Sequence, residues 1–101
     1  MTRSTHHPAY LAFLKMLREE RQMRGITQVE LAKRLGNRQT FVSKLENGER
    51  RLDVVELFEY LENIGTDPVD FLSRLRPKLH GATNRKNRKL AIRRTPSKHD
   101  G

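Results

Sequence analysis

The stretch "TQVELAKRLGNRQTFVSKLENG", residues 27–48, contains two short helical patterns joined by a Gly-Asn step. Thr27 and Glu30 have the spacing of a capping box, which predicts that a helix begins here. Gly36 can end this helix in the left-handed conformation, and we expect Asn37 to cap a second helix. Two helices joined by so short a turn form either a plain helical hairpin or a helix-turn-helix that presents its second helix to DNA.

The spacing of the apolar and small residues separates these two possibilities. Counted from Gln28, the positions that must face inward in a helix-turn-helix carry Leu31, Ala32, Leu35, Gly36, Val42 and Leu45. The bulky members can bury the inner faces, while Ala32 lets the helices cross closely and Gly36 fixes the angle between them. The outer face of the second helix, 38–47, then carries hydrogen-bonding side chains: Arg38, Gln39, Thr40, Ser43, Lys44 and Asn47.

Helical patterns flank this motif on both sides, and we find no strand pattern in the sequence. The helix limits are marked by His7 or a neighbour as a cap before Pro8, by Gly25, by Asp53 with Glu56 as a second capping box, and by Asp67 before Pro68. For the fourth helix we expect an apolar face of Val54, Leu57, Phe58 and Leu61. The sequence therefore predicts an all-α fold of five short helices.

Charge is distributed unevenly along the chain. The 101 residues include 21 Lys or Arg and 12 Asp or Glu, which gives a net charge of +9. Residues 76–101 alone carry nine Lys or Arg and one Asp, a net of +8. This segment has two prolines and no helical stripe, so we predict a folded domain over residues 1–75 and a disordered basic tail over residues 76–101, with a boundary near Arg76 and Pro77.

The expected role of the tail is a sequence-independent attraction to phosphate, with folding on DNA, RNA binding or improved solubility as alternatives. The tail has no aromatic residue to stack on bases, which argues against recognition of single strands. Its Leu90 and Ile92 are too few for an amphipathic membrane anchor. We therefore expect no membrane partner.

Several other classes of site are excluded or disfavoured by the composition. The chain has no cysteine, which excludes disulfides, thiolate metal sites and cysteine nucleophiles. His6 and His7 are adjacent and lack the spacing and further ligands of a metal site. We find no catalytic constellation or glycine-rich phosphate loop, so we expect no enzyme, no cofactor and no metal. The short apolar runs and the lack of a secretory leader predict a cytoplasmic protein.

The run "LAKRLG" followed by "VSKLENG" resembles the Cro and lambda-repressor (XRE-type) helix-turn-helix regulators, over roughly residues 10–73. This resemblance implies a five-helix, lambda-repressor-like domain that binds operator DNA, commonly as a dimer. It implies that base edges in the major groove are contacted by Gln39, Thr40, Ser43 and Lys44. It implies phosphate contacts by Gln28, by Asn47 and near the amide of Arg38, and an ion pair of Glu46 with Arg21.

The chemistry of these residues agrees with the implied roles. Gln can make paired hydrogen bonds to adenine, Lys can donate to guanine, and Ser or Thr can serve either base. Gln28 stands at a helix N-terminus, which favours phosphate, although it could also be only a first-turn residue.

The sequence leaves two interpretations open for each of three other features. We assign Arg50 to phosphate, but Arg50 and Arg51 could equally be solvated. Phe41 lies next to the outer face, where it either packs against the fourth helix, the interpretation that we favour, or touches a thymine methyl. The acidic stripe of the fourth helix, Glu56, Glu59 and Glu62, is either a solvated face turned away from DNA or a surface for a basic partner.

Two functions follow from this reading. The first is a sequence-specific, double-stranded DNA-binding transcriptional regulator, acting as a homodimer on half-sites about 34 Å apart. We expect repression more than activation, because a domain this small can block polymerase by occupying DNA. The alternative is an antitoxin-type interaction module that autoregulates through DNA and binds a partner protein, with the acidic fourth helix as the candidate surface.

Overall fold

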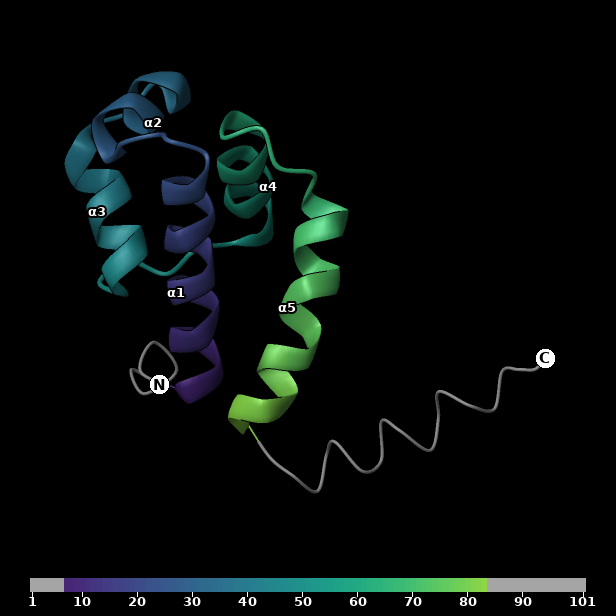
Figure 1. Ribbon diagram of the computed structural model, residues 1–101. Helices are drawn as coiled ribbons and strands as arrows, with labels where there is room; N and C mark the ends of the chain where they lie inside the picture. Colours follow the sequence, from purple (N-terminus) through teal and green to yellow (C-terminus); the bar gives the residue numbers. More distant parts are fainter. Residues whose placement is uncertain (1–6, 84–101) are drawn as a thin grey trace.

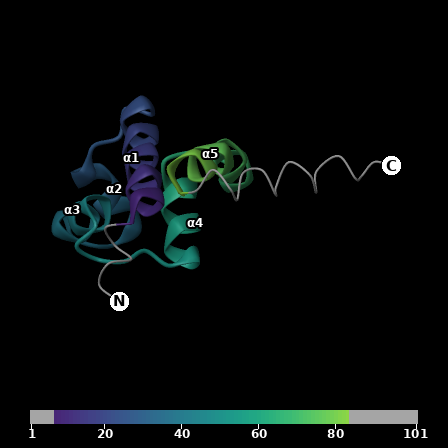
Figure 2. The ribbon, with the colours of Figure 1, turned by 90° about the horizontal axis from the view of Figure 1, so that it is seen from below.

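The computed structural model describes residues 7–83, which form five α-helices and no strand (Figure 1). The helices are α1 (Pro8–Met23), α2 (Gln28–Leu35), α3 (Gln39–Asn47), α4 (Val54–Asn63) and α5 (Pro68–Thr83). In Figure 1 and in the perpendicular view of Figure 2, α2 and α3 lie on one side of α1, and α4 and α5 lie on the other. The predicted all-α, five-helix fold is confirmed.

The predicted helix starts are largely confirmed by their caps. The Nδ1 atom of His7 accepts a hydrogen bond from the backbone two residues later, at 3.1 Å. The hydroxyl of Thr27 accepts from the backbone N–H of Glu30 at 3.0 Å, while the carboxylate of Glu30 pairs with an arginine instead of completing a capping box. Asp53 and Glu56 form a reciprocal capping box. Each cap satisfies backbone donors that the first turn of a helix leaves unpaired.

The turn between α2 and α3 differs from the prediction at one residue. Gly36 has the expected left-handed conformation, with φ of 68°, which a residue with a side chain adopts only at a cost. The prediction that Asn37 caps α3 is wrong: the N-cap is Arg38, and its side chain makes no capping hydrogen bond. The side-chain oxygen of Asn37 accepts from the backbone N–H of Arg38, at 2.9 Å. Asn37 therefore stabilises the turn rather than the helix.

The core lies between α1 and the other helices. Its most deeply buried side chains, all at most 1% exposed, are Leu17, Leu31, Val42, Leu45, Tyr60, Leu61 and Phe71. The predicted face of α4 is only half right, because Leu57 and Leu61 are buried whereas Val54 is 65% exposed and Phe58 is 36% exposed. Helix α4 is rotated so that Tyr60 faces the core, one turn after Leu57.

Helix α5 is longer than predicted. We expected the folded part to end near Arg76 and Pro77, but α5 includes Pro77 and continues to Thr83. Proline lacks a backbone donor and weakens a helix interior. Here Leu75 is buried and Leu79 packs against the core at i, i+4 spacing, and this apolar contact outweighs the lost hydrogen bond. The rest of the tail predicted to be disordered, from residue 84 onward, lies outside the described residues.

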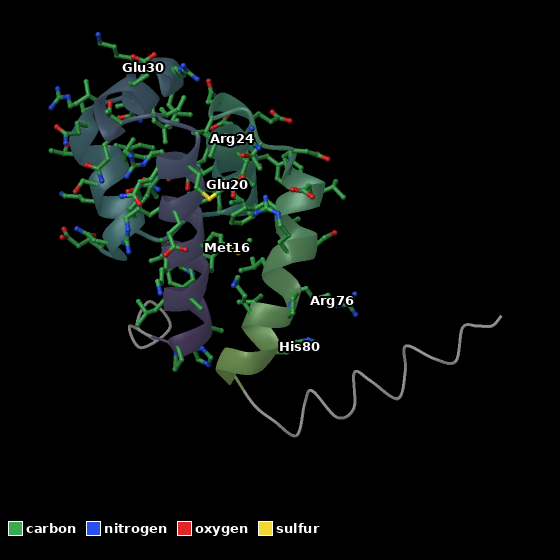
Figure 3. All side chains as sticks on the ribbon, viewed as in Figure 1. Met16, Glu20, Arg24, Glu30, Arg76 and His80 are labelled. Carbon is green, nitrogen blue, oxygen red and sulfur yellow. The ribbon has the colours of Figure 1, made fainter. Side chains whose placement is uncertain are left out.

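A buried carboxylate that the sequence did not reveal joins α1 to α5. Glu20 is only 4% exposed and accepts a hydrogen bond from the hydroxyl of Thr66 at 2.8 Å. Arg74 of α5 donates to both of its oxygens, at 3.0 and 3.2 Å, and Arg24 lies 3.5 Å away. Figure 3 labels Glu20 and Arg24 on α1, on the side facing α4 and α5. The hydrogen bonds from Arg74 lower the pKa of Glu20 despite its burial.

Candidate nucleic-acid interface

Helix α3 forms an edge of the molecule in both ribbon views (Figures 1 and 2). Its Val42 and Leu45 are buried, which turns the remaining positions outward. The residues predicted to contact bases lie on this helix: Gln39, Thr40 and Lys44 are exposed, and Ser43 is half-buried. Of the residues predicted to contact phosphate, Arg38, Asn47 and Arg50 are exposed and Gln28 is half-buried. The fold thus places the predicted base-contacting residues on one short, well-anchored helix.

The residues that follow α3 are held in place by local contacts. Asn47 donates to the carboxylate of Glu49 at 2.9 Å and accepts from the backbone N–H of the same residue at 3.0 Å. The guanidinium of Arg50 lies 3.0 Å from the carboxylate of Glu56 and 4.8 Å from the centre of the Phe41 ring. Arg50 is therefore already paired in the free protein, so a DNA phosphate would have to share the guanidinium of Arg50 with Glu56 or displace the Glu56 carboxylate from it.

Phe41 packs against the core as a partly buried side chain, which confirms the packing interpretation. The acidic residues Glu59 and Glu62 of α4 are exposed. This acidic face is not remote from α3, because Glu56 pairs with Arg50 and Glu59 lines a small pocket together with Phe41.

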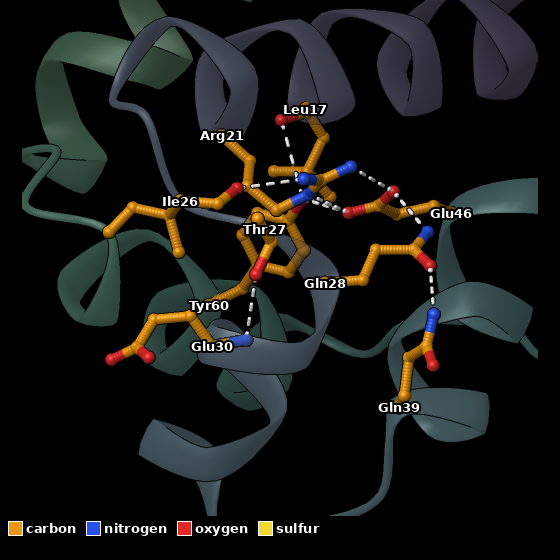
Figure 4. Close-up of polar contacts among 9 residues, drawn as sticks. All are labelled: Leu17, Arg21, Ile26, Thr27, Gln28, Glu30, Gln39, Glu46 and Tyr60. Atoms are coloured by element: carbon orange, nitrogen blue, oxygen red, sulfur yellow. Dashed lines mark hydrogen bonds and ion pairs between the residues drawn. The ribbon is translucent and has the colours of Figure 1, made fainter.

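The expected ion pair between Arg21 and Glu46 is confirmed. Arg21 donates from Nε to Oε2 of Glu46 at 2.6 Å and from Nη2 to Oε1 at 2.9 Å, and both side chains are buried (Figure 4). Its third donor, Nη1, reaches the backbone oxygen of Ile26 at 2.8 Å. The two hydrogen bonds to Glu46 match the planar shape of the guanidinium group, and they fix the end of α1 against α3.

Two further donors reach the same carboxylate. Tyr60 of α4 donates its hydroxyl to Oε2 of Glu46 at 2.5 Å, and Gln28 of α2 donates from Nε2 to Oε1 at 3.0 Å (Figure 4). Burial alone would raise the pKa of Glu46, but the hydrogen bonds from Arg21, Tyr60 and Gln28 outweigh it and the pKa is lowered. Burial and the adjacent Glu46 charge raise the pKa of Tyr60, so its hydroxyl stays a donor.

A last hydrogen bond extends this chain of contacts to the outer face of α3. Gln39 donates from Nε2 to Oε1 of Gln28 at 3.2 Å. The side chain of Gln28 therefore connects the buried carboxylate of Glu46 to a residue predicted to read bases (Figure 4). Sequence reasoning missed Tyr60 in this network, although a tyrosine at an inward position of α4 needs a buried partner for its hydroxyl.

Residues 7–83 contain no group of three or more His, Cys, Asp or Glu side chains that could hold a metal ion. Over the same residues, no helix has the length and apolar character needed to cross a membrane.

Comparisons with known proteins place the chain in a family. Residues 17–71 match the family model described as helix-turn-helix. Among solved structures, the chain is similar to an "XRE-family like protein" from Pseudomonas syringae pv. tomato str. DC3000, with 52% sequence identity and a TM-score of 0.69. This match covers 76% of our chain and 94% of the other. The comparison with curated proteins gave no match. The chain therefore belongs to the XRE-type helix-turn-helix family of DNA-binding regulators, with their lambda-repressor-like fold.

Proposed function

We propose that this regulator recognises a specific double-stranded DNA sequence by inserting α3 into the major groove. The observation that carries the proposal is the outer face of α3, whose polar side chains stand on a helix fixed by buried Val42 and Leu45 and by the Arg21–Glu46 pair. Base edges are contacted by Gln39, Thr40, Ser43 and Lys44. Phosphates are contacted by Gln28, Arg38, Asn47 and Arg50, which position the helix without reading sequence.

The regulator acts in the cytoplasm as a homodimer and represses transcription by occupying its operator. A two-fold dimer places two copies of α3 about one turn of DNA apart, so the operator is a near-palindrome. This follows from symmetry, because each copy presents the same residues to its half-site.

The proposal is tested by selecting sites from a randomised duplex library at physiological salt with excess competitor DNA. The wild-type chain should enrich a near-palindrome. The matched control replaces Gln39, Thr40 and Lys44 with alanine, which removes base contacts but keeps residues 84–101. This control should bind DNA weakly and enrich nothing. If both proteins enriched the same sequence, or neither enriched any, base readout by α3 would be refuted.

The antitoxin-type alternative is favoured by one observation on α4. Val54 and Val55 are 65% and 63% exposed, and the neighbouring Phe58, Glu59 and Glu62 are also exposed. Exposed apolar side chains beside charged ones are typical of protein-binding surfaces. In this case native mass spectrometry of the chain purified from its host should show a fixed-stoichiometry complex with another protein.

A matched pair of variants locates that surface. Val54→Asp should abolish the complex, while Val69→Asp, at an equally exposed valine of α5, should retain it. Self-association alone, unchanged by Val54→Asp, would argue for the simple regulator.

A further inference from the structure

We propose that Tyr60, a buried residue of α4, is a positioning residue for base readout: through Glu46 and Gln28, its hydroxyl fixes the orientation of the Gln39 amide. The inference rests on the proposed readout by Gln39 and adds to it a residue that touches no DNA. It is carried by four connected hydrogen-bonding side chains on three helices, drawn in Figure 4.

The first step is the saturation of the Glu46 carboxylate. Oxygen Oε2 accepts from Arg21 at 2.6 Å and from Tyr60 at 2.5 Å, and oxygen Oε1 accepts from Arg21 at 2.9 Å and from Gln28 at 3.0 Å. An ionised carboxylate has about four such acceptor directions, so each donor holds one of them. Glu46 is only 3% exposed, which leaves water little access to replace a lost donor. The carboxylate therefore has one favoured orientation.

The second step is the orientation of two amide groups. An ionised carboxylate accepts but cannot donate, so Gln28 must turn its NH2 group toward Glu46 and its oxygen away. That oxygen accepts from the NH2 group of Gln39, which in turn leaves the oxygen and the second N–H of Gln39 for a ligand. Flipping either amide would bring two acceptors or two donors face to face. Gln39 is thus held with the acceptor and donor that match the major-groove edge of adenine.

The third step is the contribution of the Tyr60 hydroxyl to the position of the Glu46 carboxylate. Its ring is 0% exposed within the core, so the hydroxyl has a fixed position, and the backbone oxygen of Leu17 lies 3.4 Å from it. Hydrogen bonds to an ionised acceptor are about twice as strong as neutral ones. Without the hydroxyl, only Arg21 would hold Oε2, and the carboxylate would shift toward Arg21 and away from Gln28. Tyr60 therefore keeps Oε1 within reach of Gln28.

The test compares Tyr60→Phe with a matched control, Tyr10→Phe. The hydroxyl of Tyr10 accepts from the backbone N–H of Leu52 at 3.0 Å. The control therefore removes a hydroxyl outside the relay, the chain of hydrogen bonds from Tyr60 through Glu46 and Gln28 to Gln39. The base position read by Gln39 is first identified as the one where Gln39→Ala loses discrimination. Tyr60→Phe should weaken discrimination there by roughly three- to tenfold. Tyr10→Phe should not change it.

A second readout needs no DNA. In the free protein, the side-chain NH2 signals of Gln28 and Gln39 in 15N–1H spectra should shift in Tyr60→Phe and stay in place in Tyr10→Phe. Unchanged amide signals in Tyr60→Phe would overturn the inference whatever happens on DNA. A different result is that the signals shift but Gln39→Ala keeps full discrimination at every base position. This would refute base reading by Gln39, and with it the role of Tyr60 in readout.

A third variant covers the case in which Tyr60→Phe fails to fold. Gln28→Leu cuts the relay at the partly exposed α2 residue and leaves the Arg21–Glu46–Tyr60 contacts intact. It should cause the same loss of discrimination at the Gln39 position. An equal loss of affinity for all sequences would instead mark Gln28 as a phosphate contact only and would overturn the relay.

Discussion

Gln39, on the exposed face of α3, donates a hydrogen bond to Gln28 at the start of α2, at 3.2 Å. The two helices of the motif are thus joined at their outer surface as well as through the buried Leu31 and Val42. A side chain held in this way loses less conformational freedom on binding than a free one, so part of the ordering cost of recognition is met during folding. In the proposed readout, the same contact would make base recognition by Gln39 depend on the buried Glu46 behind the interface.

Lys44 should contribute specificity rather than general affinity. It is an exposed residue of α3, one turn from Thr40, and its ammonium can donate to the acceptors of guanine. Lys44→Ala should cost about 1 to 3 kcal/mol at one base position and leave binding to random DNA nearly unchanged. Competition binding with the selected operator and its single-base variants measures this. If operator and random DNA weaken equally, Lys44 contacts phosphate.

Removing residues 84–101 should reduce the salt dependence of DNA binding. This segment carries seven Lys or Arg and one Asp, and cutting at residue 84 leaves α5 and its packing on α1 complete. Each phosphate contact that is lost should lower the slope of log K against log salt concentration by about 0.9. Titrations from low to physiological salt give the slope. A truncated chain with the wild-type slope would show that the segment makes no phosphate contact.

The length of α5 shows what local sequence rules miss. Pro77 suggested a helix end, because proline lacks a backbone donor. The opposing signal was the i, i+4 spacing of Leu75 and Leu79, both of which pack against the core. A local rule gives the cost of the proline but not the value of that contact, which depends on α1 lying alongside.

The network at Glu46 was predictable only in part. The pair with Arg21 was implied by the family resemblance and is confirmed. Tyr60 was missed because Val54 and Phe58 also form an apolar i, i+4 pair and suggested a different rotation of α4. Gln28 was expected to face phosphate, yet in the free protein it donates to Glu46, a residue 18 positions away. Contacts over such separations are set by how helices cross.

Breaking the buried ion pair should be costly. Arg21→Met would leave the Glu46 carboxylate buried without its main partner, and such changes typically destabilise a protein by about 3 to 5 kcal/mol. Arg24→Met is a suitable control, because Arg24 is an exposed residue one turn along whose ion pair with Glu20 spans 3.5 Å. The control should change the free energy of unfolding by about 0.5 kcal/mol or less. Urea unfolding followed by circular dichroism compares the two, and equal losses would mean that Glu46 tolerates being unpaired.

Acid should destabilise the domain through Glu20 as well as through Glu46. Hydrogen bonds from Arg74 lower the pKa of Glu20 in the folded state, so the unfolded state binds more protons as the pH falls. The stability from this carboxylate is complete above the unfolded-state pKa of about 4.3 and is lost progressively as the pH falls below it toward the folded-state value.

The test is thermal unfolding of the wild type and of Glu20→Gln between pH 7 and pH 3. Glu20→Gln should be less stable than the wild type at pH 7, because Arg74 and Thr66 lose an ionised acceptor. The difference should shrink below about pH 4, because the carboxylate of the unfolded wild type takes up a proton there while the folded-state pKa is lower. Glu62→Gln, at an exposed position of α4, should follow the wild-type curve throughout. A constant gap between wild type and Glu20→Gln down to pH 3 would show that Glu20 contributes no pH-dependent stability in this range.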